Sequence, residues 1–252
     1  MTIGFTSTTF AALEPEKICA LGAEAGADCI EWSGRHITSP AQGKELAARC
    51  AALGIACRSV GSYYYVGEAD PVRWEHICQI AAALDASFIR VWLGKKGSAK
   101  TSEQEYAALL ADARQMLGIA AHYGLMISAE AHPNTYNDSC KSSLRFLRDI
   151  DRPKFTTYFQ SLYRDMPMDL DRLAQTYPYV NAAHVSFSEV TRNRMLLPKE
   201  GGCVERVVAA LRERQFKGPL LLEFVSRNNS KTFLRDMARL RQLANPQPAG
   251  TA

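Results

Sequence analysis

Short runs of β-branched, aromatic and aliphatic residues alternate with longer helix-like segments along the chain, and this alternation limits the possible folds more than any other feature. Eight such runs are expected to be strands, over residues 3–5, 29–32, 55–60, 88–92, 125–129, 155–159, 179–185 and 220–224. Strict alternation predicts βαβ units, in which parallel strands form one sheet and helices cover it. The 252 residues divide into eight units of about 31 residues, the size of one strand–helix module.

The helix-like segments carry residues that commonly begin helices. Asp70 and Pro71 are the expected N-cap and first residue of one helix. Thr101 with Gln104 three residues later has the pattern of a capping box. The expected helices span about residues 15–25, 40–53, 71–84, 101–123, 138–150, 169–176, 203–214 and 230–243.

A parallel sheet of eight strands either closes into a barrel or stays open with helices on both faces. An open sheet normally suggests a nucleotide site with the pattern GxGxxG after the first strand, and the sequence has no such pattern there. No stretch rich in Gly, Ser or Pro divides the chain. The sequence therefore favours a single-domain α/β fold, a (β/α)8 TIM barrel over residues 1–244, with a frayed tail at residues 245–252.

Composition and charge restrict the partners and the location. No apolar run reaches the roughly 18–20 residues that a membrane span requires. The chain has 30 Lys and Arg residues against 26 Asp and Glu, and the basic residues are scattered, unlike the patch of a nucleic-acid-binding protein. The seven cysteines include no CxxC pair, and the N-terminus lacks a signal-peptide pattern. We expect a cytoplasmic protein with free thiols that binds neither membrane nor nucleic acid.

Four potential metal ligands fall at the ends of the last four expected strands. They are Glu130, Gln160, His184 and Glu223, separated by 30, 24 and 39 residues. Neighbouring strands lie about 5 Å apart, so side chains at equal height can converge on one ion. Two carboxylates, an imidazole and an amide oxygen suit Mn²⁺, Mg²⁺ or Co²⁺, and Zn²⁺ also accepts such ligands. These residues alone leave open a metal-assisted enzyme or a barrel that only binds a ligand.

Further residues near strand ends are expected to contact a substrate. They are Glu31, Trp92, Lys95, His132 and Arg194, and Arg35 is another cation in such a loop. In barrels of this type the chemistry takes place at the C-terminal ends of the strands, where Arg or Lys can bind a phosphate or carboxylate. The tyrosines at 63–65 are expected beyond the third strand, as an apolar wall for a sugar ring. Each residue also has an ordinary alternative role in a salt bridge, in the core or in solvent.

Segments at five of the expected strands resemble one known family. They are Cys29-Ile30-Glu31, Phe88-Ile89-Arg90-Val91-Trp92-Leu93-Gly94, Ser128-Ala129-Glu130-Ala131-His132-Pro133, His184-Val185 and Gly218-Pro219-Leu220-Leu221-Leu222-Glu223. In this order and spacing they resemble the xylose isomerase-like TIM barrel superfamily, in the branch called sugar phosphate isomerases/epimerases. The resemblance covers nearly the whole chain, and it is specific for the superfamily but not for a reaction.

The resemblance implies a divalent metal ion held by Glu, Asp, His and Glu from the fifth to the eighth strand. Glu130, His184 and Glu223 match these positions, while Gln160 stands where the family usually has Asp. The neutral amide makes the site less negative by one charge. In the ketose 3-epimerase branch both Glu ligands exchange protons with the substrate, so the resemblance implies that Glu130 and Glu223 are catalytic as well as metal-binding.

The implied function is a metal-dependent isomerase or epimerase of a small sugar, sugar phosphate or polyol ketone, in which a proton moves next to a carbonyl through an enediolate. A lyase, dehydratase or keto-glycoside-cleaving enzyme on the same barrel is the alternative. An endonuclease IV-like nuclease fits less well, because such enzymes hold three Zn²⁺ ions with many His ligands and this chain has five His. A non-catalytic ligand-binding barrel is a further alternative. Because relatives are often dimers or tetramers, a homo-oligomer is also expected.

Overall fold

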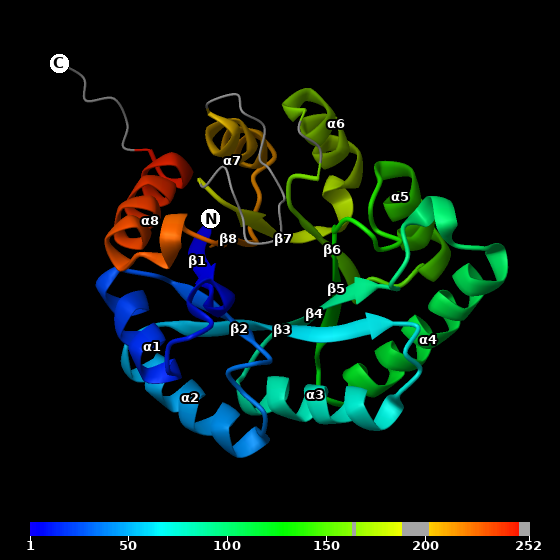
Figure 1. Cartoon of the computed structure of the whole chain (residues 1–252), viewed down its shortest axis with the longest axis horizontal. Helices are drawn as coiled ribbons and strands as arrows, with labels where there is room; N and C mark the ends of the chain where they lie inside the picture. Colours follow the sequence, from blue (N-terminus) through cyan, green and yellow to red (C-terminus); the bar gives the residue numbers. More distant parts are fainter. Residues whose placement is uncertain (163–164, 188–201, 247–252) are drawn as a thin grey trace.

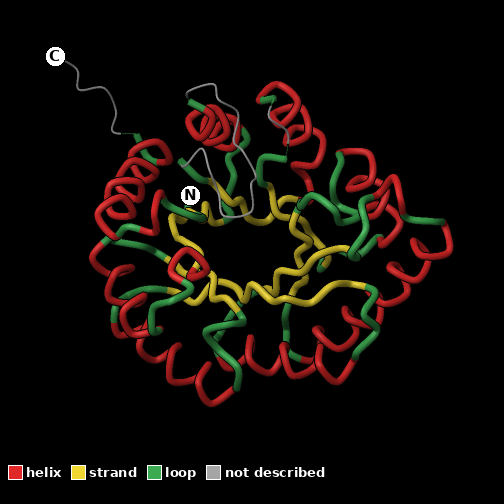
Figure 2. Tube along the Cα trace, in the orientation of Figure 1, coloured by secondary structure: helices red, strands yellow, loops and turns green. Residues whose placement is uncertain are grey.

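The computed structural model describes residues 1–162, 165–187 and 202–246. These residues form a closed barrel of eight parallel strands in the order β1 to β8, and β8 pairs with β1 to close it. The helices lie outside the ring of strands (Figure 1), and Figure 2 shows the ring in yellow with the helices around it in red. The chain is therefore the single-domain (β/α)8 TIM barrel that the sequence predicts.

The strands and helices alternate throughout the described residues. The strands are β1 (Thr2–Thr6), β2 (Cys29–Ser33), β3 (Ala56–Val66), β4 (Phe88–Leu93), β5 (Met126–Glu130), β6 (Phe155–Phe159), β7 (Val180–Val185) and β8 (Pro219–Leu222). The helices are α1 (Pro15–Glu24), α2 (Pro40–Ala52), α3 (Pro71–Ala83), α4 (Glu103–His122), α5 (Cys140–Ile150), α6 (Met166–Thr176), α7 (Cys203–Glu213) and α8 (Ser230–Ala244). Short 3-10 turns lie at η1 (Ser7–Phe10), η2 (Ser98–Lys100), η3 (Tyr177–Tyr179) and η4 (Ser226–Asn228).

The caps explain where α3 and α4 begin. Asp70 caps α3 as expected, and its side chain accepts a hydrogen bond from the backbone N–H of the third helical residue. The expectation for α4 was wrong by one residue. Ser102 is its N-cap, and Glu105 completes the capping box in place of Thr101 and Gln104. A carboxylate in the first turn also suits the positive end of the helix dipole.

The interior of the barrel is apolar at its base and charged towards the C-terminal ends of the strands. The base is a separate small cluster of Cys29, Phe88, Tyr158, Ala182 and Leu221, with Met126 packed against it. Alternate residues of a strand face the same side of a sheet. Glu31, Arg90 and His184 each lie two residues after a member of this cluster, on β2, β4 and β7 respectively. Their side chains therefore point into the barrel as well, and all three are buried.

The strand β3 is longer than the sequence suggests. It has 11 residues, and the tyrosines 63–65 lie within it instead of in a loop beyond it. Its register with β4 shifts between Gly61 and Tyr65. Aromatic residues fit a pleated, half-buried surface well, which accounts for the extension.

The barrel ends with α8 at Ala244. Of the tail expected at residues 245–252, only residues 245 and 246 are among those described. Within the described part of the chain, no helix combines the length and the apolar character needed to cross a bilayer.

Candidate metal centre and active site

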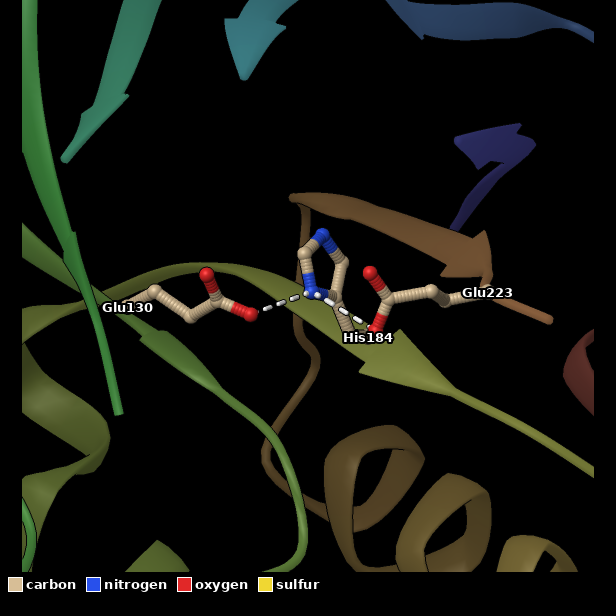
Figure 3. A group of neighbouring side chains, drawn as sticks. All are labelled: Glu130, His184 and Glu223. Atoms are coloured by element: carbon tan, nitrogen blue, oxygen red, sulfur yellow. Dashed lines mark ion pairs between the residues drawn. The ribbon is translucent and has the colours of Figure 1, made fainter. Parts of the chain in front are cut away.

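Glu130, His184 and Glu223 converge at the C-terminal end of the barrel, as Figure 3 shows. Glu130 is the last residue of β5, His184 lies in β7, and Glu223 directly follows β8. The Nδ1 atom of His184 lies 3.3 Å from Oε1 of Glu130 and 3.6 Å from Oε2 of Glu223. One ligand atom from each residue lies within 4.8 Å of the other two. Two carboxylate oxygens and one imidazole nitrogen are a donor set that suits a divalent cation.

The environment of His184 supports this interpretation. Both ring nitrogens are buried, and neither makes a hydrogen bond within the described part of the chain. Nδ1 faces the two carboxylates of Figure 3, while Nε2 lies 3.4 Å from Oε1 of Glu31. Metal-binding histidines commonly have a carboxylate beside the second nitrogen, and a buried polar atom is costly without a partner. The residues present therefore fit a divalent metal ion.

Glu130 is held in place by two donors from β4. Arg90 forms an ion pair with Oε2 of Glu130, and the indole Nε1 of Trp92 donates a hydrogen bond to the same oxygen at 2.7 Å. The other oxygen, Oε1, faces His184. The carboxylate of Glu130 thus has one anchored oxygen and one oxygen turned to the candidate cation site.

Glu31 belongs to the level beneath the cation site and not to the mouth of the barrel. Its carboxylate accepts hydrogen bonds from Arg90 Nε at 3.1 Å and from Ser59 Oγ at 3.1 Å, and a further one from the Tyr158 hydroxyl. Every partner is buried, and the carboxylate lies beside both Arg90 and His184. The role of Glu31 as a substrate contact stays a prediction.

Burial and charge separate the pKa values of the ionisable groups. Burial lowers the pKa of His184, but the carboxylates of Glu223 and Glu31 outweigh it and raise that pKa to about 10. Burial has the opposite effect on a carboxyl group and raises the pKa of Glu223 to about 7. Burial acts in the same direction on Glu130, but the charge of Arg90 overrides it and holds the pKa of Glu130 well below its usual range. Two carboxylates whose pKa values are pushed apart commonly have different roles.

A cavity of about 140 Å³ opens beside the two carboxylates. Its lining includes Arg35, Tyr63, Trp92, Glu130, His132 and Glu223. The ring of Trp92 packs against those of Tyr63 and His132, with centroids 5.7 Å apart in both pairs. The structure thus brings Trp92 and His132, two of the expected substrate contacts, into the wall of this cavity.

The residue after Glu223 has an uncommon backbone. Phe224 has a φ of 54°, in the left-handed region that bulky residues seldom adopt. Two buried hydrogen bonds hold it: its N–H donates to Thr9 Oγ1 at 3.0 Å, and its carbonyl accepts from Ser186 Oγ at 2.9 Å. Such strain is found at functional sites, and here the chain turns directly after Glu223, beyond the end of β8.

The other expected site residues have different outcomes. Gln160 follows β6 and is buried, and its amide Nε2 donates to the carbonyl oxygen of Ala131 at 2.7 Å; its role as a ligand stays a prediction. Lys95 pairs with Glu68 at 3.1 Å and lines a neighbouring cavity of about 270 Å³. Arg194 lies outside the described residues.

Sequence reasoning missed two residues that organise the site, Arg90 and Tyr158. Arg90 lies inside the otherwise apolar strand β4 and Tyr158 inside β6, two positions before Trp92 and Gln160 respectively. Residues two apart on a strand face the same side, so Arg90 and Tyr158 share the inner face with Trp92 and Gln160. This spacing could have identified them, because a polar side chain inside the barrel requires a partner there.

The fold and the site together define a TIM barrel with a carboxylate–histidine group at the C-terminal ends of its strands. A family model described as xylose isomerase-like TIM barrel matches residues 19–243. The chain belongs to this family, in agreement with the resemblance seen in its sequence.

Comparison with individual proteins gives a more limited result. The 3-dehydroshikimate dehydratase of Bacillus anthracis is 28% identical over 112 residues, and the match covers 44% of this chain and only 40% of that protein. The crystal structure of the probable 3-DHS dehydratase AsbF of Bacillus anthracis superposes with a TM-score of 0.80 and 18% identity, covering 98% of this chain and 100% of that one.

Two further structures have the same fold. The IolI protein with a bound zinc atom gives a TM-score of 0.78 at 15% identity, covering 96% of each chain. The 3-keto-D-glucoside 4-epimerase YcjR of E. coli gives 0.76 at 14% identity, covering 96% of this chain and 99% of that one. At such identities the structural likeness shows the fold alone. The relatives include a dehydratase and an epimerase, which agrees with the expectation of an enzyme.

Proposed function

We propose that this protein is a divalent-metal-dependent enzyme that removes a proton from the carbon next to a carbonyl in a small hydroxy ketone and then eliminates water. The observation that carries the proposal is the difference between the two carboxylates. Glu130 is anchored by Arg90 and Trp92, whereas the side chain of Glu223 makes no hydrogen bond within the described residues and is 13% exposed beside the cavity. Glu130 therefore serves as an anchor and Glu223 as the base.

Glu130, His184 and Glu223 would hold the cation, and Gln160 is proposed as a fourth ligand. A divalent cation, when bound, supplies the positive charge that stabilises an oxygen anion developing on the substrate. Mn²⁺, Mg²⁺ and Co²⁺ suit the predominance of oxygen ligands, and Zn²⁺ suits the imidazole. The zinc in the IolI structure supports a divalent ion without selecting among these.

The fate of the proton favours dehydration over epimerisation. Inverting one carbon atom requires a second group that delivers a proton to the opposite face. Both oxygens of Glu130 are already committed, Oε2 to Arg90 and Trp92 and Oε1 to the candidate cation site. A single base can instead take the proton next to the carbonyl and pass it to a hydroxyl that leaves as water. The partial match to a 3-dehydroshikimate dehydratase supports the same outcome. Trp92 and His132 are proposed to contact the substrate from the cavity wall.

The isomerase or epimerase predicted from the sequence shares the first step and differs only in the fate of the proton. Incubation in D₂O with 3-dehydroshikimate, ketoses, inososes and 3-keto-glycosides, followed by NMR, separates the two. We expect loss of water from 3-dehydroshikimate and an aromatic product that absorbs in the ultraviolet. Deuterium incorporation into a ketose without loss of water would support the epimerase instead.

The remaining sequence predictions stay proposals. The protein is proposed to bind a small sugar-like or polyol ketone and no nucleic acid. It is also proposed to form a homo-oligomer and to be cytoplasmic.

A further inference from the structure

Arg35 and Tyr63 form a positively charged end of the cavity. The guanidinium of Arg35 lies over the Tyr63 ring, 4.5 Å from its centroid. The Ser33 hydroxyl contacts both residues. Its oxygen accepts a hydrogen bond from the backbone N–H of Arg35 at 3.3 Å and lies 3.3 Å from the Tyr63 hydroxyl. Both residues line the same cavity as the two carboxylates.

Arg35 differs from the other arginine of the cavity in having no acidic partner. Arg90 is buried between Glu31 and Glu130 and is neutralised by them. Within the described part of the chain, no carboxylate pairs with Arg35, which is exposed at the mouth. A guanidinium stacked on an aromatic face keeps its N–H donors free for an anion such as a carboxylate or a phosphate.

An aromatic wall separates this charge from the candidate cation site. Tyr63 contacts Trp92 edge to face, and Trp92 donates to Glu130. Arg90 and Trp92 already occupy Oε2 of Glu130. Contacts therefore run from the guanidinium of Arg35 through the rings of Tyr63 and Trp92 to Glu130 of the candidate cation site, and all four residues line one cavity.

We infer that Arg35 binds an anionic substituent of the substrate, a carboxylate or a phosphate, while the carbonyl of the same molecule lies at the Glu130–His184–Glu223 site. The inference rests on the proposed function in placing one molecule across both ends of the cavity. A cavity of about 140 Å³ suits a single ring or a short chain bearing the anion, and the aromatic wall suits the face of that ring.

The test is a binding measurement that needs no turnover. Dissociation constants of 3,4-dihydroxybenzoate and catechol, which differ only in the carboxylate, are measured by calorimetry with and without Mn²⁺. The second pair is D-ribulose 5-phosphate and D-ribulose. We expect the anionic member of one pair to bind at least about tenfold more tightly than its neutral counterpart, as a charge-assisted contact allows. The pair with the larger ratio identifies the anion as carboxylate or phosphate.

Three variants assign that preference to Arg35. Arg35→Gln is expected to reduce the ratio to about twofold or less, and Arg35→Lys to retain part of it, because Lys keeps the charge but not the planar fork. Arg49→Gln removes the same charge from the exposed face of α2, where Arg49 lies 3.9 Å from Glu16, and should behave as the unaltered protein. An unchanged ratio in Arg35→Gln, or no preference for either anion in the unaltered protein, would overturn the inference.

Turnover distinguishes this inference from the proposed function. If the anion preference depends on Arg35 but 3-dehydroshikimate loses no water, the proposed dehydration fails and the anion site stands. If water is eliminated but Arg35→Gln binds both members of each pair as before, the dehydration stands and the anion site fails.

Discussion

The indole N–H of Trp92 donates to Oε2 of Glu130 at 2.7 Å, on the oxygen that also pairs with Arg90. β4 and β5 are neighbours, so one strand supplies the donors that orient the candidate ligand of the next. Outer contacts of this kind commonly change metal affinity or activity by roughly 10- to 100-fold when they are removed.

Trp92→Phe therefore tests the anchoring of Glu130. The variant keeps an aromatic ring but loses the N–H donor, and we expect Mn²⁺ affinity, measured by calorimetry, to fall by about tenfold. Trp74→Phe is the matched control, because Trp74 Nε1 donates to the Met116 carbonyl at 2.9 Å in the helical layer. The control should lose thermal stability and keep its metal affinity. Equal Mn²⁺ affinity in Trp92→Phe and the unaltered protein would refute the anchoring role.

Substitution of the two carboxylates tests their assigned roles. Glu223→Gln should lower turnover by roughly 10²- to 10⁴-fold, the usual contribution of a general base, with the circular dichroism spectrum unchanged. Glu130→Gln should also lose activity, mainly through lost metal, which elemental analysis of the purified variant would show. Glu103→Gln, on the surface beside Arg145, is the control. Near-normal turnover in both site variants would contradict the proposed site.

Removal of the metal and substitution of Gln160 test the ligand set. Dialysis against a chelator should abolish activity, and Mn²⁺, Mg²⁺, Co²⁺ or Zn²⁺ should restore it. Gln160→Asp adds the negative charge that the family usually has and should tighten Mn²⁺ binding, whereas Gln160→Ala should weaken it. If both variants bind Mn²⁺ as the unaltered protein does, Gln160 serves only to hold the Ala131 carbonyl.

The affinity for metal should rise with pH. A cation binds neutral imidazole, and the pKa of His184 in the cation-free protein is about 10, so binding at pH 7 releases its proton. We expect affinity to increase by about tenfold per pH unit between pH 7 and 9. Below pH 7 the slope should be steeper, because the pKa of Glu223 is about 7. Titration calorimetry in buffers of different ionisation enthalpy counts the released protons, and a flat profile would contradict this assignment.

The barrel and the convergence of Glu130, His184 and Glu223 could be predicted because they depend on the periodicity of the strands. Eight alternations fill the chain, and Glu130, His184 and Glu223 lie at or next to strand ends. The choice between neighbouring capping pairs was less predictable. At the start of α4 the capping pair is Ser102 with Glu105, one residue later than the expected pair.

The charged level beneath the cation site could not be predicted so simply. The ion pairs of Arg90 with Glu31 and Glu130 join residues from three strands. Their contact depends on the barrel register, which shifts between β2 and β3 at Ile30/Glu31 and between β3 and β4 at Gly61/Tyr65. A single sequence does not contain that register. The same applies to Lys95, whose neighbour Glu68 is brought to it only by the fold.

Gly61 offers a final test, because it leaves the space that Arg90 occupies. A Cβ atom at Gly61 would lie 2.8 Å from Arg90 Nη2 and 2.9 Å from Glu31 Oε1. Both side chains are fixed by their ion pair, so Gly61→Ala should destabilise the protein by about 1–3 kcal/mol, the usual cost of overpacking, and should weaken Mn²⁺ binding.

Gly118→Ala is the matched control for this variant. Gly118 lies in α4, and apart from its chain neighbours and the backbone of its own helix no heavy atom lies within 4 Å of the added carbon. Alanine is favoured over glycine in a helix by about 0.5–1 kcal/mol. Urea titrations of both variants should therefore shift the midpoint in opposite directions. If Gly61→Ala is as stable as the unaltered protein, the packing of Arg90 against this position does not constrain the site.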